Sequence, residues 1–132
     1  ADERCASMRY IARAYVGKGA PESAKVWYWR AMAEAPHLRE PYVELAKLLH
    51  DQKDLDGVLY LTGCALAIKE RPRTYISEGQ AWGSLPWDLR ALALFYTGRV
   101  KEALIAAQRA AELAPTDKRL EENLRLIRAA LG

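Results

Sequence analysis

The sequence predicts an all-α protein, built from three pairs of short antiparallel helices and one last helix that covers the end of the stack. Three observations support this fold class. Apolar residues recur at steps of three and four, which places them along one side of a helix. The same apolar pattern returns further along the chain at a constant spacing. Alanine, leucine, glutamate and arginine are frequent, and all four favour helices.

The composition is that of one globular domain over residues 1–132. Hydrophobic residues make up 51% and charged residues 28%, which excludes a disordered chain. The net charge of +3 comes from intermixed basic and acidic residues, so we expect no nucleic-acid partner. No apolar run approaches the roughly 20 residues that span a bilayer, so we expect no membrane span.

The first helix pair is expected over about residues 5–38. Its first helix covers about residues 2–16 and ends at Gly19, because glycine adopts left-handed backbone angles at little cost. Pro21 suits the first turn of the second helix, and Pro36 stops that helix. The residues expected on the apolar sides are Cys5, Met8, Ile11, Ala12, Tyr15, Ala24, Trp27, Tyr28, Ala31 and Met32.

The second pair, over about residues 39–72, repeats the first at one constant shift, so that Met8 matches Tyr42 and Ala24 matches Val58. Pro41 opens its first helix. Asp54 is the expected N-cap of its second helix, because an aspartate carboxylate accepts hydrogen bonds from free backbone N–H groups. The expected inward residues are Tyr42, Leu45, Ala46, Leu49, Val58, Leu61, Ala65 and Ile68.

The third pair, over about residues 84–117, follows the second at a larger shift, so a segment is inserted between them at about 73–83. The insert contains Tyr75, Ile76 and Trp82, and we expect this apolar segment to fold back against the helices. A capping helix follows at about 117–131, begun by Thr116 or Asp117. The residues expected to face inward from it are Leu120, Leu124, Ile127 and Leu131.

The residues Tyr15, Gly19, Ala24, Tyr28, Ala31 and Pro36 stand at the spacings of a tetratricopeptide (TPR) repeat, which the chain resembles over nearly its whole length outside the insert. The resemblance implies a right-handed superhelix of three repeats, with a concave face that binds an extended peptide or a partner helix. Two positions depart from the pattern. Lys53 stands at the turn glycine of the second repeat, and Arg90 replaces a large apolar residue in the third.

Residues 70–78 and 81–89, together with residues 39–42, resemble the TPR segment that accompanies bacterial family-two glycosyltransferases. That resemblance implies that the chain is the non-catalytic part of a larger protein with an attached catalytic domain. The opening Ala-Asp-Glu-Arg, without an initiator methionine, fits a piece of a longer chain.

The TPR register predicts a partner-binding groove on the first helix of each pair. Its residues are Arg9, Arg13, Val16, Lys47, His50, Asp51, Asp88, Leu92, Phe95 and Tyr96. Arg9, Arg13 and Lys47 would make one half positive, which suits an acidic segment or a terminal carboxylate. Phe95 and Tyr96 would offer an apolar anchor in the other half. The alternative is that these residues are ordinary solvated charges and capping contacts.

No motif predicts catalysis, a cofactor or a metal. In Asp54-Leu55-Asp56 the helix cap is favoured over a metal-binding aspartate pair, and His50 beside Asp51 has no nucleophile at a recognisable spacing. Two cysteines, Cys5 and Cys64, are no disulfide framework. They indicate a reduced, intracellular protein, and we expect it in the cytoplasm.

These observations favour a non-catalytic TPR scaffold that binds a protein or peptide partner, or that orients an attached catalytic domain. One alternative is an acceptor- or glycan-binding part of a glycosyltransferase. Another is a self-association module that uses the exposed edge of the first repeat. The asparagines with which TPR domains clamp chaperone tails are absent, so such tails are not an expected ligand. The sequence leaves the oligomeric state open.

Overall fold

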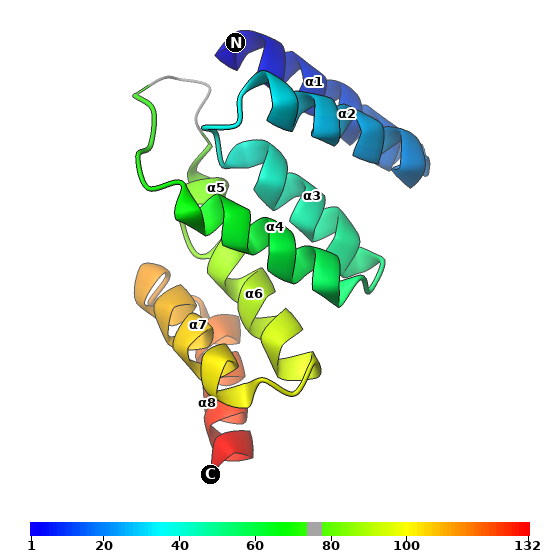
Figure 1. Cartoon of the computed structure of the whole chain (residues 1–132). Helices are drawn as coiled ribbons and strands as arrows, with labels where there is room; N and C mark the ends of the chain where they lie inside the picture. The colour runs from blue at the N-terminus through cyan, green and yellow to red at the C-terminus, as the bar shows by residue number, and fades with distance from the viewer. Residues whose placement is uncertain (74–77) are drawn as a thin grey trace.

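The computed structural model describes residues 1–73 and 78–132, and within these ranges every regular element is a helix (Figure 1). The helices are α1 (Asp2–Gly17), α2 (Pro21–Glu34), α3 (Glu40–Asp51), α4 (Leu55–Ala67), α5 (Gly79–Trp82), α6 (Leu85–Tyr96), α7 (Val100–Leu113) and α8 (Lys118–Leu131). None of the helices in the described ranges is both long and apolar enough to cross a membrane.

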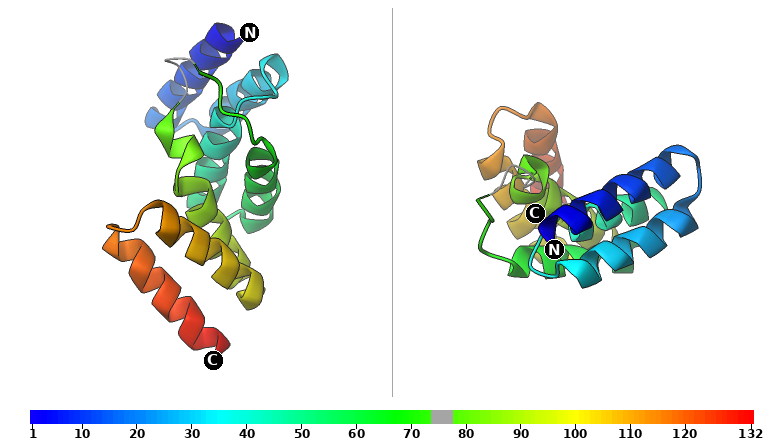
Figure 2. Two further views of the ribbon diagram at one scale, coloured as in Figure 1. Left: turned by 90° about the vertical axis from the view of Figure 1, so that its left-hand side faces the viewer. Right: turned by 90° about the horizontal axis from the view of Figure 1, so that it is seen from above.

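The helices form a stack of antiparallel pairs, as the sequence predicts. Helix α1 packs on α2, α3 on α4, and α6 on α7, while α8 lies against α7 at the far end (Figures 1 and 2). Contacts between α4 and α6 join the second pair to the third. The all-α fold class with a C-terminal capping helix is therefore confirmed.

One backbone turn recurs between the two helices of each pair. Each turn contains a left-handed residue, and the residue after it donates a backbone hydrogen bond across the turn. The left-handed residues are Gly19 (φ 74°), Lys53 (φ 62°) and Gly98 (φ 84°). The bonds run from Ala20 to Tyr15 (2.9 Å), from Asp54 to Leu49 (2.8 Å) and from Arg99 to Leu94 (2.8 Å). The second turn thus keeps its shape although lysine replaces glycine.

Two aspartates begin helices by capping their free N–H groups. Asp54 accepts a hydrogen bond from the Gly57 amide at 3.0 Å, which confirms its predicted role at the start of α4. Asp117 accepts from the Arg119 amide at 3.0 Å. Of the two residues predicted to begin the last helix, Asp117 is therefore the cap.

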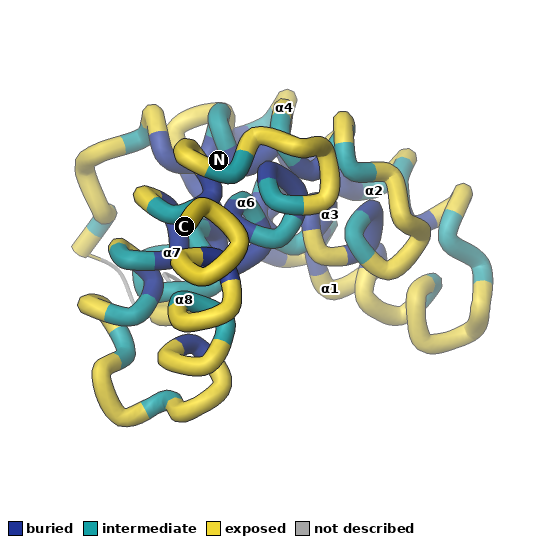
Figure 3. The backbone as a smooth tube through the Cα atoms, turned by 90° about the horizontal axis from the view of Figure 1, so that it is seen from below, coloured by how far each residue is buried: buried dark blue, intermediate teal, exposed yellow. Residues whose placement is uncertain are grey.

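The largest core cluster lies between the first two pairs and α6. Its buried members are Ala12, Ala24, Tyr28, Met32, Leu45, Ala46, Leu48, Leu49, Val58, Leu61, Leu89 and Ala93. Buried residues are most frequent on the inner helices α3 and α6 and least frequent on α8 at the end of the stack (Figure 3). Ile11 and Leu131 were expected to face inward, but they are 38% and 41% exposed. Both lie on the outermost helices of the described chain, where no further helix pair covers them.

The part of the insert that the structure describes packs against the start of α3. The Trp82 indole N–H donates to Glu40 at 3.1 Å, and the Arg39 guanidinium lies 4.2 Å from the centre of the Trp82 ring. Arg39 also donates to the Ile68 carbonyl at 2.8 Å. Of the predicted packing residues, Trp82 thus contacts the helices, while Tyr75 and Ile76 lie outside the described residues.

Replacing Trp82 by alanine is expected to lower the free energy of unfolding by about 2 kcal/mol, because the ring's packing, its hydrogen bond and its contact with Arg39 are all lost. Urea denaturation followed by circular dichroism measures the change. Trp29→Ala is the matched control, since Trp29 is 53% exposed and should change stability little. Equal effects of the two substitutions would show that the Trp82 contacts do not stabilise the chain.

Candidate peptide-binding groove

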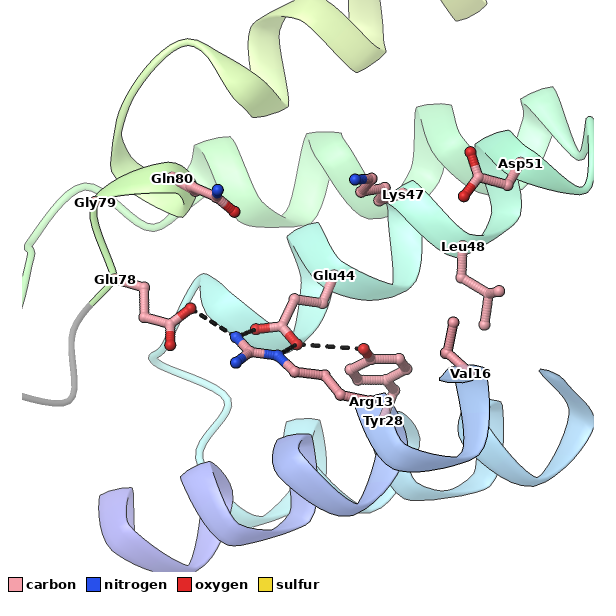
Figure 4. Close-up of a pocket in the computed structure, with 10 residues that line it drawn as sticks. All are labelled: Arg13, Val16, Tyr28, Glu44, Lys47, Leu48, Asp51, Glu78, Gly79 and Gln80. Atoms are coloured by element: carbon pink, nitrogen blue, oxygen red, sulfur yellow. Dashed lines mark hydrogen bonds and ion pairs between the residues drawn. The ribbon is translucent and has the colours of Figure 1, made fainter. Parts of the chain in front are cut away.

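A groove of about 670 Å³ opens between α1, α3 and the residues that begin α5 (Figure 4). Its lining combines charged, polar and apolar side chains from segments far apart in the sequence. The lining residues are Arg13, Val16, Tyr28, Glu44, Lys47, Leu48, Asp51, Glu78, Gly79 and Gln80. Four of them, Arg13, Val16, Lys47 and Asp51, are among the residues predicted for partner binding.

Arg13 extends from α1 and pairs with carboxylates from two other segments (Figure 4). Its Nε and Nη2 donate to the two oxygens of Glu44 at 2.8 and 2.7 Å. Nη2 also donates to Glu78 Oε2 at 2.6 Å. Hydrogen bonds to Glu44, the neighbouring charges and the hydrogen bond to Glu78 together raise the pKa of Arg13, against the opposing effect of burial. Arg13 therefore ties α1 to α3 and to the insert.

Arg9 was predicted to point into the groove, and the structure corrects this. Its side chain is only 2% exposed, and its Nη1 donates to Glu44 Oε2 at 2.6 Å and lies 3.6 Å from Glu78 Oε2. Burial lowers the pKa of Arg9, but the charge of Glu44, its hydrogen bond and the charge of Glu78 outweigh that effect and raise it. Arg9 is thus a buried, compensated cation beneath the groove.

Tyr28, on α2, is the third side chain that donates a hydrogen bond to Glu44. Its hydroxyl donates to Glu44 Oε1 at 3.2 Å, and the residue is only 3% exposed. Burial first, and then the charge of Glu44, raise the pKa of this phenol, so Tyr28 stays a neutral donor. Glu44 therefore accepts hydrogen bonds from three side chains, those of Arg9, Arg13 and Tyr28.

The pairing also corrects the expectation of a positively charged groove. Arg9 and Arg13 are balanced by Glu44 and Glu78. Lys47 differs from them, because it is exposed and has no ion-pair partner within residues 1–73 and 78–132. Within the part of the chain that the structure describes, Lys47 is thus the groove cation with a charge left for a ligand.

Two apolar side chains line the groove together with Lys47. Val16 on α1 is 41% exposed, and Leu48 on α3 lines the same groove although it is mostly buried. Asp51 lies one turn beyond Lys47, with Oδ1 3.7 Å from Nδ1 of His50. His50 itself does not line the groove. The groove thus offers one ammonium group and two apolar side chains to a ligand.

The residues predicted in the other half of the groove lie on α6 and do not line this cavity. Asp88 is 7% exposed and accepts from Arg119 Nη2 at 2.7 Å, so it joins α6 to α8 and is not open to a partner. Leu92 and Phe95 are half-buried, and Tyr96 is 68% exposed. The Phe95 and Tyr96 rings lie edge to face, with their centres 5.5 Å apart.

Sequence reasoning missed Glu44, Glu78 and Tyr28 as groove residues. A signal for Glu44 was present, because Glu44, Lys47 and Asp51 follow one another at steps of three and four and so share a helix face. Tyr28 was correctly predicted as core, and its hydroxyl reaches the groove from there. Glu78 lies in the insert, outside the repeat, so periodicity could not place it.

One helix pair of the chain matches the tetratricopeptide repeat family in sequence. The model of that family matches residues 84–117. The first TPR of Spaghetti (RPAP3), bound to the HSP90 peptide SRMEEVD, has a TM-score of 0.83 at 20% identity, covering 99% of this chain and 95% of that one. The first TPR domain of human RPAP3 has a TM-score of 0.79 at 18% identity, covering 99% and 94%. No curated protein matches the chain by sequence.

The stacked helix pairs with a groove beside them define the chain as a helical-repeat protein. Its fold is that of a TPR domain, and its third helix pair, α6 and α7, matches the TPR family in sequence. The family match begins and ends at the residues that the sequence analysis gives for the third repeat.

Proposed function

We propose that the chain is a non-catalytic scaffold that binds an extended peptide segment of a protein partner in the groove between α1, α3 and the start of α5. The observation that carries this proposal is that Lys47, whose ammonium group has no ion pair within the described residues, lines the same groove as the apolar side chains of Val16 and Leu48. A peptide carboxylate bound to Lys47 and an apolar side chain packed beside it would use both features.

Two further observations support a peptide ligand. The groove volume of about 670 Å³ suits a few side chains of an extended segment and lies within the usual range of ligand pockets. A TPR domain of similar fold, the first TPR of Spaghetti, was solved with the HSP90 peptide SRMEEVD. The partner of the present chain is defined here by its chemistry, a carboxylate next to an apolar residue.

The predicted link to glycosyltransferases stays a prediction. It rests on residues 70–78 and 81–89 together with residues 39–42, and neither the family match nor the two solved structures adds support to it. An attached catalytic domain, glycan binding and self-association likewise stay predictions. No observation on the groove favours any of these over a peptide ligand.

Selection from a displayed library of random peptides tests the proposal. We expect enriched peptides that carry Asp or Glu next to an apolar residue, and Lys47→Glu should weaken their binding at least tenfold, because it replaces attraction by repulsion. Fluorescence anisotropy with the enriched peptides measures the dissociation constants. Lys47 is preferable to Arg13 for this test, since reversing Arg13 would also break its pairs with Glu44 and Glu78.

Lys101→Glu is the matched control, because Lys101 is an exposed lysine on α7 and lies outside the groove. It makes the same charge change and should leave the dissociation constants unchanged. Equal weakening by both variants would indicate a general charge effect and would contradict the groove. A library that yields no enriched peptide would contradict the proposed function itself.

A further inference from the structure

One carboxylate in the groove comes from outside the repeating helices. Glu78 precedes α5, and its backbone N–H donates to Glu40 Oε2 at 2.9 Å. The Trp82 indole N–H donates to the same oxygen at 3.1 Å. The start of α3 therefore anchors this part of the insert and fixes where the Glu78 side chain enters the groove.

The Glu78 carboxylate points toward the Arg13 guanidinium from the segment that precedes α5 (Figure 4). Its Oε2 lies 2.6 Å from Arg13 Nη2 and 3.6 Å from Arg9 Nη1. Glu44, on α3, approaches the same guanidinium groups from within the helix stack. Glu44 alone would balance only one of the two arginine charges. Glu78 supplies the second negative charge.

The two carboxylates differ in how firmly they are held. Glu44 is 18% exposed and accepts from Arg9, Arg13 and Tyr28. Glu78 is 34% exposed, and its close partner Arg13 is 42% exposed. Ion pairs with that much solvent contact are weak, and a carboxylate from another molecule can replace one member at little cost. Of these two carboxylates, Glu78 is therefore the one that a ligand carboxylate can replace on Arg13.

From this arrangement we propose that Glu78 is an intrachain competitor, which fills a carboxylate-binding site on Arg13 until a glutamate or aspartate of the bound peptide displaces it. The inference rests on the proposed peptide-binding function and adds a second acidic contact to it, besides the one at Lys47. Glu78 lowers the affinity of the free groove for acidic peptides, because each peptide must first break the internal ion pair.

The experiment compares the full chain with Glu78→Gln, which keeps the shape of the side chain but removes its charge. The probe is a fluorescein-labelled, end-blocked peptide of alternating glutamate and leucine, and the same peptide with glutamine in place of glutamate is the probe control. We expect Glu78→Gln to bind the acidic probe about fivefold more tightly than the unaltered chain, as the loss of one partly exposed internal ion pair implies. The glutamine probe should gain nothing.

Two further variants make the result specific. Glu70→Gln is the matched control, because Glu70 is exposed, lies in the same connecting segment and forms no ion pair with the residues that the structure describes. It should leave the dissociation constant unchanged. Arg13→Gln added to Glu78→Gln should abolish the gain. Circular dichroism checks that each variant is folded, and Glu78→Ala, which also cannot pair with Arg13, serves as the second test should Glu78→Gln not fold.

The outcomes separate this inference from the proposed function. Saturable binding of the acidic probe with the same dissociation constant in both chains overturns the competitor role but leaves peptide binding intact. A gain that survives Arg13→Gln also overturns it, since the probe would then bind elsewhere. No binding of the acidic probe to Glu78→Gln overturns the inference as well, while the proposed function is decided by the library selection.

Discussion

Replacing Glu44 by glutamine is expected to lower the free energy of unfolding by about 3 kcal/mol, because it leaves a buried arginine without its close counter-charge. The Arg9 side chain is 2% exposed, and its remaining carboxylate, Glu78, lies 3.6 Å away instead of 2.6 Å. The substitution keeps the volume of the side chain, so the loss reports charge compensation and not a cavity. Urea denaturation at neutral pH measures it.

Glu34→Gln is the matched control for that experiment. Glu34 pairs with Arg4 at 2.6 Å, as short a contact as that between Glu44 and Arg9, but Arg4 is 69% exposed. Solvent screens such a pair, so its loss should leave the urea midpoint unchanged. A Glu44→Gln chain that unfolds at the midpoint of the unaltered protein would mean that Arg9 is stable in the core without a charged partner.

Leu45→Ala is expected to lower the free energy of unfolding by about 3 kcal/mol, since it removes a large side chain from the main core and leaves a cavity. Leu45 is 1% exposed and contributes to the cluster that joins the first two helix pairs. Differential scanning calorimetry and urea denaturation should both record the loss. The effect tests whether the helix pairs depend on one another.

The control for Leu45 is the residue that matches it in the first repeat. Ile11 holds the same place in that repeat, but it is 38% exposed because no helix pair precedes α1 in the structure. Ile11→Ala should therefore cost about 1 kcal/mol or less. Equal losses of unfolding free energy from both substitutions would contradict this. They would mean that burial by a neighbouring helix pair does not determine how much these residues stabilise the fold.

The sequence predicted the helices well because their signals are local. Apolar periodicity, Pro21 and Pro41 at helix starts and Asp54 as a cap each act within one helix, and all reappear in the structure. Lys53 shows that glycine is not required at every such turn, since its backbone keeps the left-handed angle that glycine has in the other two turns. The backbone hydrogen bond from Asp54 to Leu49 still closes that turn, as its counterparts close the other two.

The groove was predicted only in part, because its chemistry depends on contacts between distant segments. The register picked out Arg13, Val16, Lys47 and Asp51, which line the cavity of the structure. It could not show that Arg9 is buried, or that Asp88 pairs with Arg119 on α8. Nor could it bring Glu78, 65 residues away along the chain, to Arg13. Each of these depends on how the helix pairs stack, and the periodic pattern does not encode that.

The balance of charges around the groove has a consequence for how a partner arrives. Three basic residues in and beneath the groove are matched by three acidic ones. The basic residues are Arg9, Arg13 and Lys47, and the acidic residues are Glu44, Asp51 and Glu78. Such a surface exerts little electrostatic force beyond a Debye length, so it does not steer a peptide from a distance. Association should then proceed at the rate set by diffusion and orientation, nearly independent of ionic strength, and partners should be distinguished by how long they stay bound.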